Sequence, residues 1–223
     1  MKDSNYLRQH RGKFCFIDLE TYNLCLSFEV NRPWQTSMFI TQRNDTIEKI
    51  DRLTKWNVGL EMGKEAAIIT RYDKYNSRWE MSMREALEKH GEDESETFKC
   101  IDEKLNECDY IVAHNGIGFD FQLLKEWYRI HNKSFDKFIP KLIDTNCIAR
   151  AVLSETKFHE EREDLFAFQM KIYHKRMRGI KSSLGVLGKN FEIEHDYDTL
   201  HDAYSDLDLN VKVWNKLKWM INV

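Results

Sequence analysis

The stretch FCFIDLET, residues 14–21, joins an apolar strand to two carboxylates. Its first four residues are apolar and strand-forming, and Asp18 and Glu20 follow with only Leu19 between them. Because side chains alternate across a strand, Asp18 and Glu20 share one face, about 6.6–6.8 Å apart along the chain. Two carboxylates this close beside a core raise each other's pKa. Either water solvates both groups at an exposed strand end, or a divalent cation such as magnesium or manganese binds them.

The composition is that of one globular domain. The chain has 223 residues, of which 42% are hydrophobic, and its 34 basic and 37 acidic residues give a net charge of -3. A nucleic-acid partner would therefore need a local basic patch. Five cysteines without a CxxC pair favour reduced thiols in a cytoplasmic compartment. Since no apolar run reaches the roughly 18 residues of a membrane helix, no membrane partner is expected, and residues 1–12 form a polar lead-in.

The pattern of apolar runs predicts an α/β domain with a mixed sheet flanked by helices. The first three expected strands are joined by short links, which suggests an antiparallel meander, and later strands alternate with helices. Strands are expected at residues 13–19, 24–30, 36–42, 109–114 and 141–144. Helices are expected at residues 81–90, 94–107, 119–131, 145–153, 183–190 and 199–220. The highly charged residues 155–182 show no clear period.

Further carboxylates occur at two later positions. Asp120 follows a buried strand and a turn (IVAHNGIGFD), where a carboxylate can also simply begin a helix. In the last helix (LHDAYSDLDLN), Asp206 lies within about 60° of the centre of the apolar face, whereas Asp202 lies about 100° away and Asp208 about 140° away. An inward carboxylate without a partner is costly. His201 is the titratable group nearest to Asp206 at the start of this helix.

Taken in order, these motifs resemble the DEDD exonucleases, in the branch with a histidine in the last motif (DEDDh). This family includes the proofreading subunit of bacterial replicative polymerases and phage and cellular 3′-5′ exonucleases. The DxET motif appears at residues 18–21, an HNxxFD-like motif with one extra residue at 114–120, and HxAxxD at 201–206. The resemblance implies one exonuclease domain over residues 13–223, with a ribonuclease H-like fold built on a five-stranded mixed sheet.

The resemblance also implies a two-metal site. Asp18, Glu20, Asp120 and Asp206 would hold two Mg²⁺ or Mn²⁺ ions, with Asp18 bridging them. Such a pair of ions stabilises the attacking and leaving oxygens of a displacement at phosphorus. His201, with an ordinary pKa of about 6.5, would act as the general base. The product expected is a nucleoside 5′-monophosphate released from a 3′ end.

Candidate substrate-binding residues fall into two groups. The first adjoins the metal motifs and could wedge or stack the terminal base, although Leu19 and Phe119 are equally expected in the core. This group is Leu19, Thr21, Tyr22 and Phe119. The second is a basic run, residues 174–181, which either tracks the phosphates of a single strand or is only a solvated face. Its candidate phosphate contacts are Lys175, Arg176, Arg178 and Lys181.

Three functions fit these observations. The first is a metal-dependent 3′-5′ exonuclease on single-stranded nucleic acid, with DNA favoured over RNA by family association. The second is a proofreading subunit docked on a polymerase. The third is a catalytically silent nucleic-acid-binding module on the same fold, against which the presence of all four acids and the histidine argues.

Overall fold

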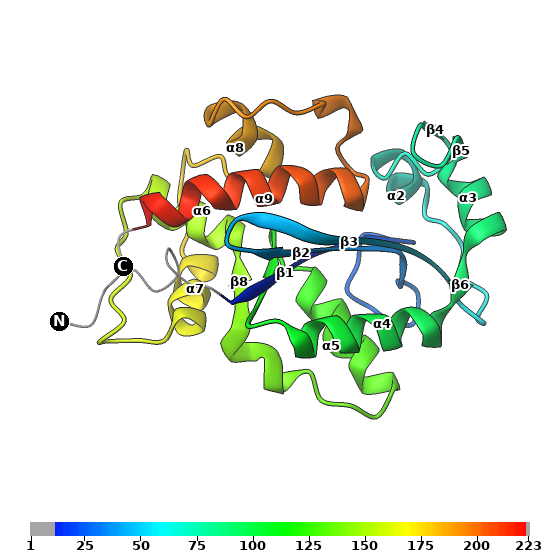
Figure 1. Ribbon diagram of the computed structural model, residues 1–223, viewed down its shortest axis with the longest axis horizontal. Helices are drawn as coiled ribbons and strands as arrows, with labels where there is room; N and C mark the ends of the chain where they lie inside the picture. Colours follow the sequence, from blue (N-terminus) through cyan, green and yellow to red (C-terminus); the bar gives the residue numbers. More distant parts are fainter. Residues whose placement is uncertain (1–11, 222–223) are drawn as a thin grey trace.

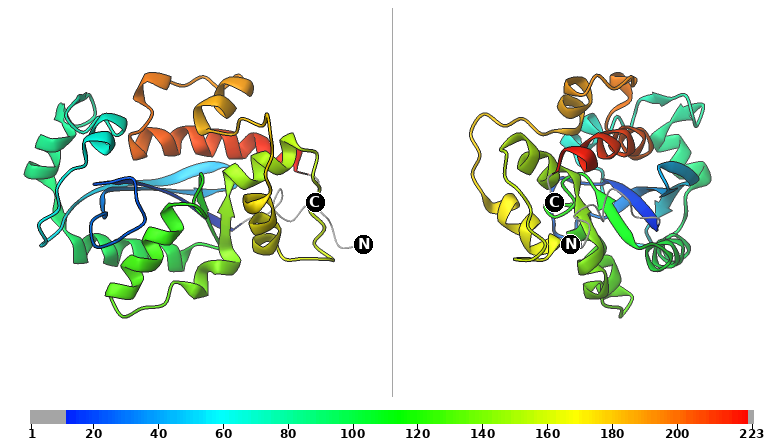
Figure 2. Two further views of the ribbon diagram at one scale, coloured as in Figure 1. Left: turned by 180° about the vertical axis from the view of Figure 1, so that it is seen from behind. Right: turned by 60° about the vertical axis from the view of Figure 1, so that its left-hand side comes forward.

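The computed structural model describes residues 12–221 of the chain. The lead-in expected over residues 1–12 therefore lies, apart from Gly12, outside the described residues. Within them, a mixed sheet is covered by helices on both faces (Figures 1 and 2), which confirms the predicted α/β class. No helix in this part of the chain is long and apolar enough to cross a bilayer.

The sheet is built around β1 (Lys13–Thr21), the strand that carries FCFIDLET. β1 is antiparallel to β2 (Pro33–Gln42) and parallel to β7 (Tyr110–Ala113). On one side β2 continues into antiparallel β3 (Asp45–Lys55), and on the other β8 (Leu142–Asp144) is parallel to β7. The apolar residues of β1 are buried on both faces, as expected of a central strand.

Within residues 12–221 the sheet has six strands, so the expected count of five was wrong. The strand order is β6-β3-β2-β1-β7-β8. The additional strand, β6 (Glu92–Asp93), is only two residues long and pairs in parallel with Thr54 and Lys55 at the end of β3. So short a strand carries no period in the sequence, which is why the apolar pattern did not indicate it.

The meander differs from the prediction in its second and third strands. Residues 24–30 form turns and bends, in which Leu24, Leu26 and Val30 are exposed and Phe28 is buried. The buried amide of Asn31 binds this loop, because its side chain accepts from the Asn23 backbone N–H at 2.7 Å. β2 is therefore the second strand. β3 is the third, although its many charged residues gave no strand signal.

Helices cover both faces of the sheet. α9 (Ala203–Met220) crosses one face, and α6 (Thr145–Leu153) and α8 (Leu184–Asn190) pack against it (Figure 1). α4 (Glu94–Glu107) and α5 (Asp120–Ile130) lie on the opposite face (Figure 2). The other helices are α2 (Lys64–Ile69), α3 (Met83–His90), α7 (Leu165–His174), η1 (Asp136–Lys141) and η2 (Tyr197–Thr199). α4 and α6 have the expected bounds, and α7 lies in the charged segment that showed no period.

The inward face of α9 is the one expected from its helical period. Its five members, spaced three or four residues apart, are all buried: Ala203, Leu207, Asn210, Trp214 and Leu217. Burying a leucine side chain contributes about 1.5–3 kcal/mol to stability, so this face holds α9 on the sheet. The amino end of α9 is thereby fixed near the carboxyl end of β1.

Candidate active site

Three carboxylates meet where β1 ends and α9 begins. Asp18 and Glu20 lie on the face of β1 that α9 covers, and Asp206 lies in the first turn of α9. One carboxylate oxygen from each of these residues lies within 4.8 Å of the others. Strand alternation and helix packing therefore bring together three acids that are far apart in the sequence.

Burial and mutual repulsion disfavour the charged forms of these acids. Burial raises the pKa of Asp18 well above its ordinary value, and the neighbouring charges of Asp120 and Asp206 raise it further. The pKa of Glu20 is also raised well above the ordinary value, first by burial and then by Asp18. Burial raises the pKa of Asp206 to about 7.

No side-chain cation compensates the four acids within residues 12–221. None of Asp18, Glu20, Asp120 and Asp206 forms an ion pair with a described lysine, arginine or histidine. Clustered carboxylate oxygens are the ligands that Mg²⁺ and Mn²⁺ prefer. The donor set therefore fits a divalent metal ion, and ionising all four groups without one is costly.

Asp120 lies beside the cluster but is turned toward the backbone of β1. It is the first residue of α5, is 4% exposed, and accepts a hydrogen bond from the Leu19 N–H at 3.1 Å. Burial raises its pKa to about 7. Its charge acts on Asp18, but its oxygens are outside the group of three that lie within 4.8 Å of one another.

The turn before Asp120 depends on Asp144, which is not among the predicted site residues. Asp144 is fully buried at the end of β8, and its carboxylate accepts the backbone N–H groups of Asn115 and Ile117, each at 3.0 Å. It also accepts the N–H of Asn146 at 2.9 Å as the N-cap of α6. Asp144 could have been found from the sequence, because an aspartate directly before an expected helix is a common N-cap.

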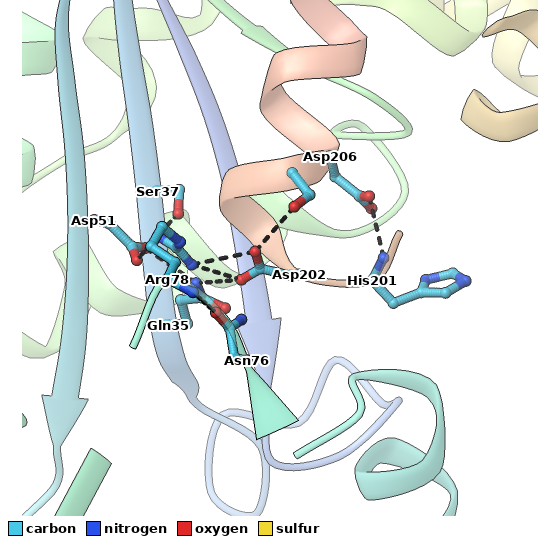
Figure 3. Close-up of polar contacts among 9 residues, drawn as sticks. Gln35, Ser37, Asp51, Asn76, Arg78, His201, Asp202 and Asp206 are labelled. Carbon is cyan, nitrogen blue, oxygen red and sulfur yellow. Dashed lines mark hydrogen bonds and ion pairs between the residues drawn. The ribbon is translucent and has the colours of Figure 1, made fainter. Parts of the chain in front are cut away.

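His201 contacts the cluster through its backbone. Its N–H donates to Oδ1 of Asp206 at 3.1 Å, while its imidazole is exposed and points away from that carboxylate (Figure 3). Its φ of 68° is in the left-handed region. Partial desolvation holds the pKa of His201 below its ordinary value, so the ring is neutral at pH 7. The predicted base is thus at the site, with its ring directed away from Asp206.

Several solved structures of Exonuclease I from E. coli are similar to this chain. The complex with a dT13 oligonucleotide has a TM-score of 0.66 and 19% identity, over 93% of this chain and 41% of that chain. The complex with dA16 has a TM-score of 0.68 and 18% identity over the same shares. A zinc-bound complex with single-stranded DNA has a TM-score of 0.65 and 18% identity, over 94% and 41%. No family model and no curated protein sequence matches the chain.

The chain has the fold of the Exonuclease I structures. The ribonuclease H-like fold implied by the three motifs is thereby confirmed. The chain spans about two fifths of the length of the Exonuclease I chain that it matches. At 18–19% identity, the likeness establishes the fold.

A charged network that the sequence analysis did not anticipate adjoins this site. Asp202 is the N-cap of α9, and its Oδ1 accepts from Gln35 at 2.8 Å and from Arg78 at 2.9 Å (Figure 3). Arg78 also pairs with Asp51, which accepts a hydrogen bond from Ser37 at 2.5 Å. The helical period predicted that Asp202 would point away from the apolar face. This period does not apply to Asp202, because the residue precedes the first turn of α9.

The first group of candidate substrate residues is largely buried. The Leu19 side chain is 4% exposed and packs in the core, as the alternative interpretation expected, and Thr21 is 3% exposed with its hydroxyl donating to the Asn23 backbone oxygen. Tyr22 and Phe119 are partly buried and pack against core residues. Of the four residues, only Tyr22 and Phe119 therefore expose part of their side chains to a ligand.

The basic run leaves α7 and ends beside the site. Lys175, Arg176, Arg178 and Lys181 are exposed, and none of them forms an ion pair with another described residue. Ser182, which follows, accepts a hydrogen bond from the side chain of Asn146 at 3.3 Å. Asn146 lies at the start of α6, directly after β8, so the run ends at the edge of the sheet where β1 also ends.

Proposed function

We propose that this chain is a metal-dependent 3′-5′ exonuclease that hydrolyses single-stranded DNA. The observation that carries the proposal is the convergence of Asp18, Glu20 and Asp206 without a compensating cation among the described residues. The similar Exonuclease I structures support the substrate, since they hold dT13 and dA16 oligonucleotides, and a zinc-bound form supports a divalent ion. DNA is favoured over RNA for the same reason.

The acids would hold two Mg²⁺ or Mn²⁺ ions. The carboxylates of Asp18, Glu20 and Asp206 would hold the ions, with Asp120 beside them. When bound, the ions supply electrostatic stabilisation of the attacking and leaving oxygens at phosphorus. The hydrogen bond from the Leu19 N–H holds the Asp120 carboxylate in a fixed orientation against the strand that carries Asp18.

His201 would accept the proton of the attacking water. A neutral imidazole near pH 7 is suited to this role, and the lowered pKa of His201 keeps it neutral. The water oxygen would form a bond to phosphorus, the bond from phosphorus to the 3′ oxygen of the preceding nucleotide would break, and that 3′ oxygen would take up a proton from solvent. The last nucleotide then leaves as a 5′-monophosphate.

The strand would be bound by the basic run and by the rings near the acids. Arg176, Arg178 and Lys181 have no ion-pair partner among residues 12–221, so their charges are available to phosphates. Lys175 is also exposed, with its Nζ at 3.5 Å from the Thr156 hydroxyl. Tyr22 and Phe119 would contact the terminal base, while Leu19 and Thr21 support the site from within the core.

The proposal is tested by incubating 5′-labelled single-stranded DNA and RNA with the protein in Mg²⁺ or in EDTA. A ladder that shortens from the 3′ end only with Mg²⁺ is expected, more rapidly on DNA. Asp18→Asn and Asp206→Asn should abolish it. Asp208→Asn is the matched control, because Asp208 lies on the same helix and pairs with Lys212 at 2.7 Å outside the cluster. Tight binding without shortening would contradict the proposal and favour the silent module.

A further inference from the structure

Arg78 joins two acidic side chains that lie beside the metal-ligand cluster. It lies in the turn between β4 (Tyr75–Asn76) and β5 (Met81–Ser82), outside the main sheet. Its Nη1 pairs with Asp51, and its Nη2 lies 2.9 and 3.1 Å from the two oxygens of Asp202 (Figure 3). The Asp51 and Asp202 side chains are only 9% and 13% exposed, so both acids need a cation.

Asp202 connects this ion network to His201 and Asp206. Although Asp202 is the N-cap residue of α9, its carboxylate does not cap the helix and binds Arg78 and Gln35 instead. Its backbone oxygen accepts the Asp206 N–H at 2.9 Å, and the preceding His201 donates its N–H to the Asp206 carboxylate at 3.1 Å. Holding Asp202 in place therefore also holds the turn between His201 and Asp206.

The network and the metal-ligand cluster share one face of the sheet. Ser37 lies opposite Asp18 in the β1–β2 register, and Gln35 lies opposite Glu20. Gln35 Nε2 donates to both acids of the network, at 3.0 Å to Asp51 and 2.8 Å to Asp202. Two more carboxylates thus lie next to an uncompensated acidic cluster, and Arg78 is the cation that neutralises them.

We propose that Arg78 is a positioning residue of the active site. By pairing with Asp51 and Asp202 together, it fixes the His201–Asp206 turn and keeps Asp202 directed away from the metal ligands. Arginine suits this role because its planar guanidinium can bind two carboxylates at once. The ring of Tyr204 lies 4.2 Å from the guanidinium carbon and supports it by a cation–π contact. This inference rests on the proposed nuclease function.

The first test compares single-turnover cleavage of labelled single-stranded DNA by Arg78→Gln, Asp202→Asn and the double variant. With enzyme in saturating excess, the single-turnover rate constant does not depend on the fraction of enzyme that is folded. A variant that loses only stability would therefore keep the wild-type rate constant. We expect Arg78→Gln to slow cleavage by about 10–100-fold, as for residues that orient catalytic groups. The double variant should be no more than about twofold slower than Arg78→Gln, because both changes break one connection.

The matched control is Arg84→Gln. Arg84 pairs with Asp73 at 2.6 Å, and both side chains are 54% exposed at the surface of the same region. This variant removes one arginine from one ion pair outside the site and should cleave at the wild-type rate. An unchanged rate in Arg78→Gln, an equal loss in Arg84→Gln, or multiplying losses in the double variant would each overturn the inference.

A second measurement does not need cleavage. Hydrogen exchange followed by NMR reports whether the His201 N–H still donates to Asp206, with the buried Ile17 and Val112 amides as internal references for global unfolding. We expect exchange at His201 to be at least about tenfold faster in Arg78→Gln, with the references unchanged. If the wild type cleaves nothing, the proposed function fails while this measurement still decides the role of Arg78. Unaltered exchange at His201, or no protection in the wild type, would refute that role.

Discussion

The Asp120 carboxylate accepts a hydrogen bond from the backbone N–H of Leu19, the residue that separates Asp18 from Glu20. This bond joins the start of α5 to the end of β1 across 101 residues of sequence. The same side chain thus has two separable roles: it holds the strand that carries two proposed metal ligands, and it adds a fourth carboxylate.

The variants Asp120→Asn and Asp120→Ala separate these roles. Asparagine can still accept from the Leu19 N–H but does not carry the charge, so we expect loss of cleavage with little loss of stability. Alanine leaves the buried Leu19 N–H without a partner. The free energy of unfolding should therefore be about 1–3 kcal/mol lower in Asp120→Ala than in Asp120→Asn. Urea unfolding and single-turnover cleavage of both variants provide the measurements. Equal stabilities would show that the hydrogen bond contributes nothing.

Local periodicity was enough to place three of the acids. Strand alternation put Asp18 and Glu20 on one face, and the helical period turned Asp206 inward, as the structure shows. These predictions hold because the direction of a side chain within a regular element depends on its position in that element alone. The same reasoning recovered the bounds of α4 and α6.

Residues outside regular elements could not be placed in this way. Asp202 precedes α9, and Arg78 reaches it from a turn 124 residues away, so only the tertiary fold brings them together. The positive φ of His201 could not be predicted either, because the sequence around it indicates only that it lies before a helix. β3 was missed because its exposed, charged side chains obscure the alternation that marks a half-buried strand.

The role of the His201 imidazole can be tested without disturbing the backbone. Because His201 has a φ of 68°, His201→Asn is the better variant, since asparagine tolerates the left-handed region more readily than alanine. The backbone N–H to Asp206 is retained, so only the base is lost. We expect single-turnover cleavage to fall by about 10²–10⁴-fold. His159→Asn, at a partly exposed histidine outside the site, should cleave normally, and a wild-type rate in His201→Asn would remove the imidazole from catalysis.

The basic run should contribute to binding through charge alone. We expect Arg176→Gln/Arg178→Gln to weaken binding of single-stranded DNA irrespective of sequence, and to reduce the salt dependence of log K by about 0.7 for each lost phosphate contact. Lys89→Gln/Lys99→Gln removes the same charge from exposed positions on α3 and α4 and serves as the control. Fluorescence anisotropy at several salt concentrations measures both slopes. Identical slopes for the two double variants would show that the run is only a solvated face.

The acidic cluster predicts that the metal-free protein loses stability as the pH rises. Asp120 and Asp206 have pKa values of about 7 in the folded protein against an ordinary value of 3.8, and burial is the main cause for both. Between these values the folded chain binds more protons than the unfolded chain, so the free energy of unfolding falls with increasing pH. This loss of stability is complete above about pH 7, where Asp120 and Asp206 are both ionised.

Thermal unfolding in EDTA at about pH 5 and about pH 8 measures this loss, which we expect to be on the order of a few kcal/mol. Excess Mg²⁺ should restore stability at the higher pH, since binding to the folded state alone stabilises it. Asp206→Asn should reduce both the loss and the restoration, whereas Asp208→Asn, at a carboxylate already paired with Lys212, should alter neither. If the free energy of unfolding of the metal-free protein stays level or increases between these pH values, the four acids do not form an uncompensated cluster.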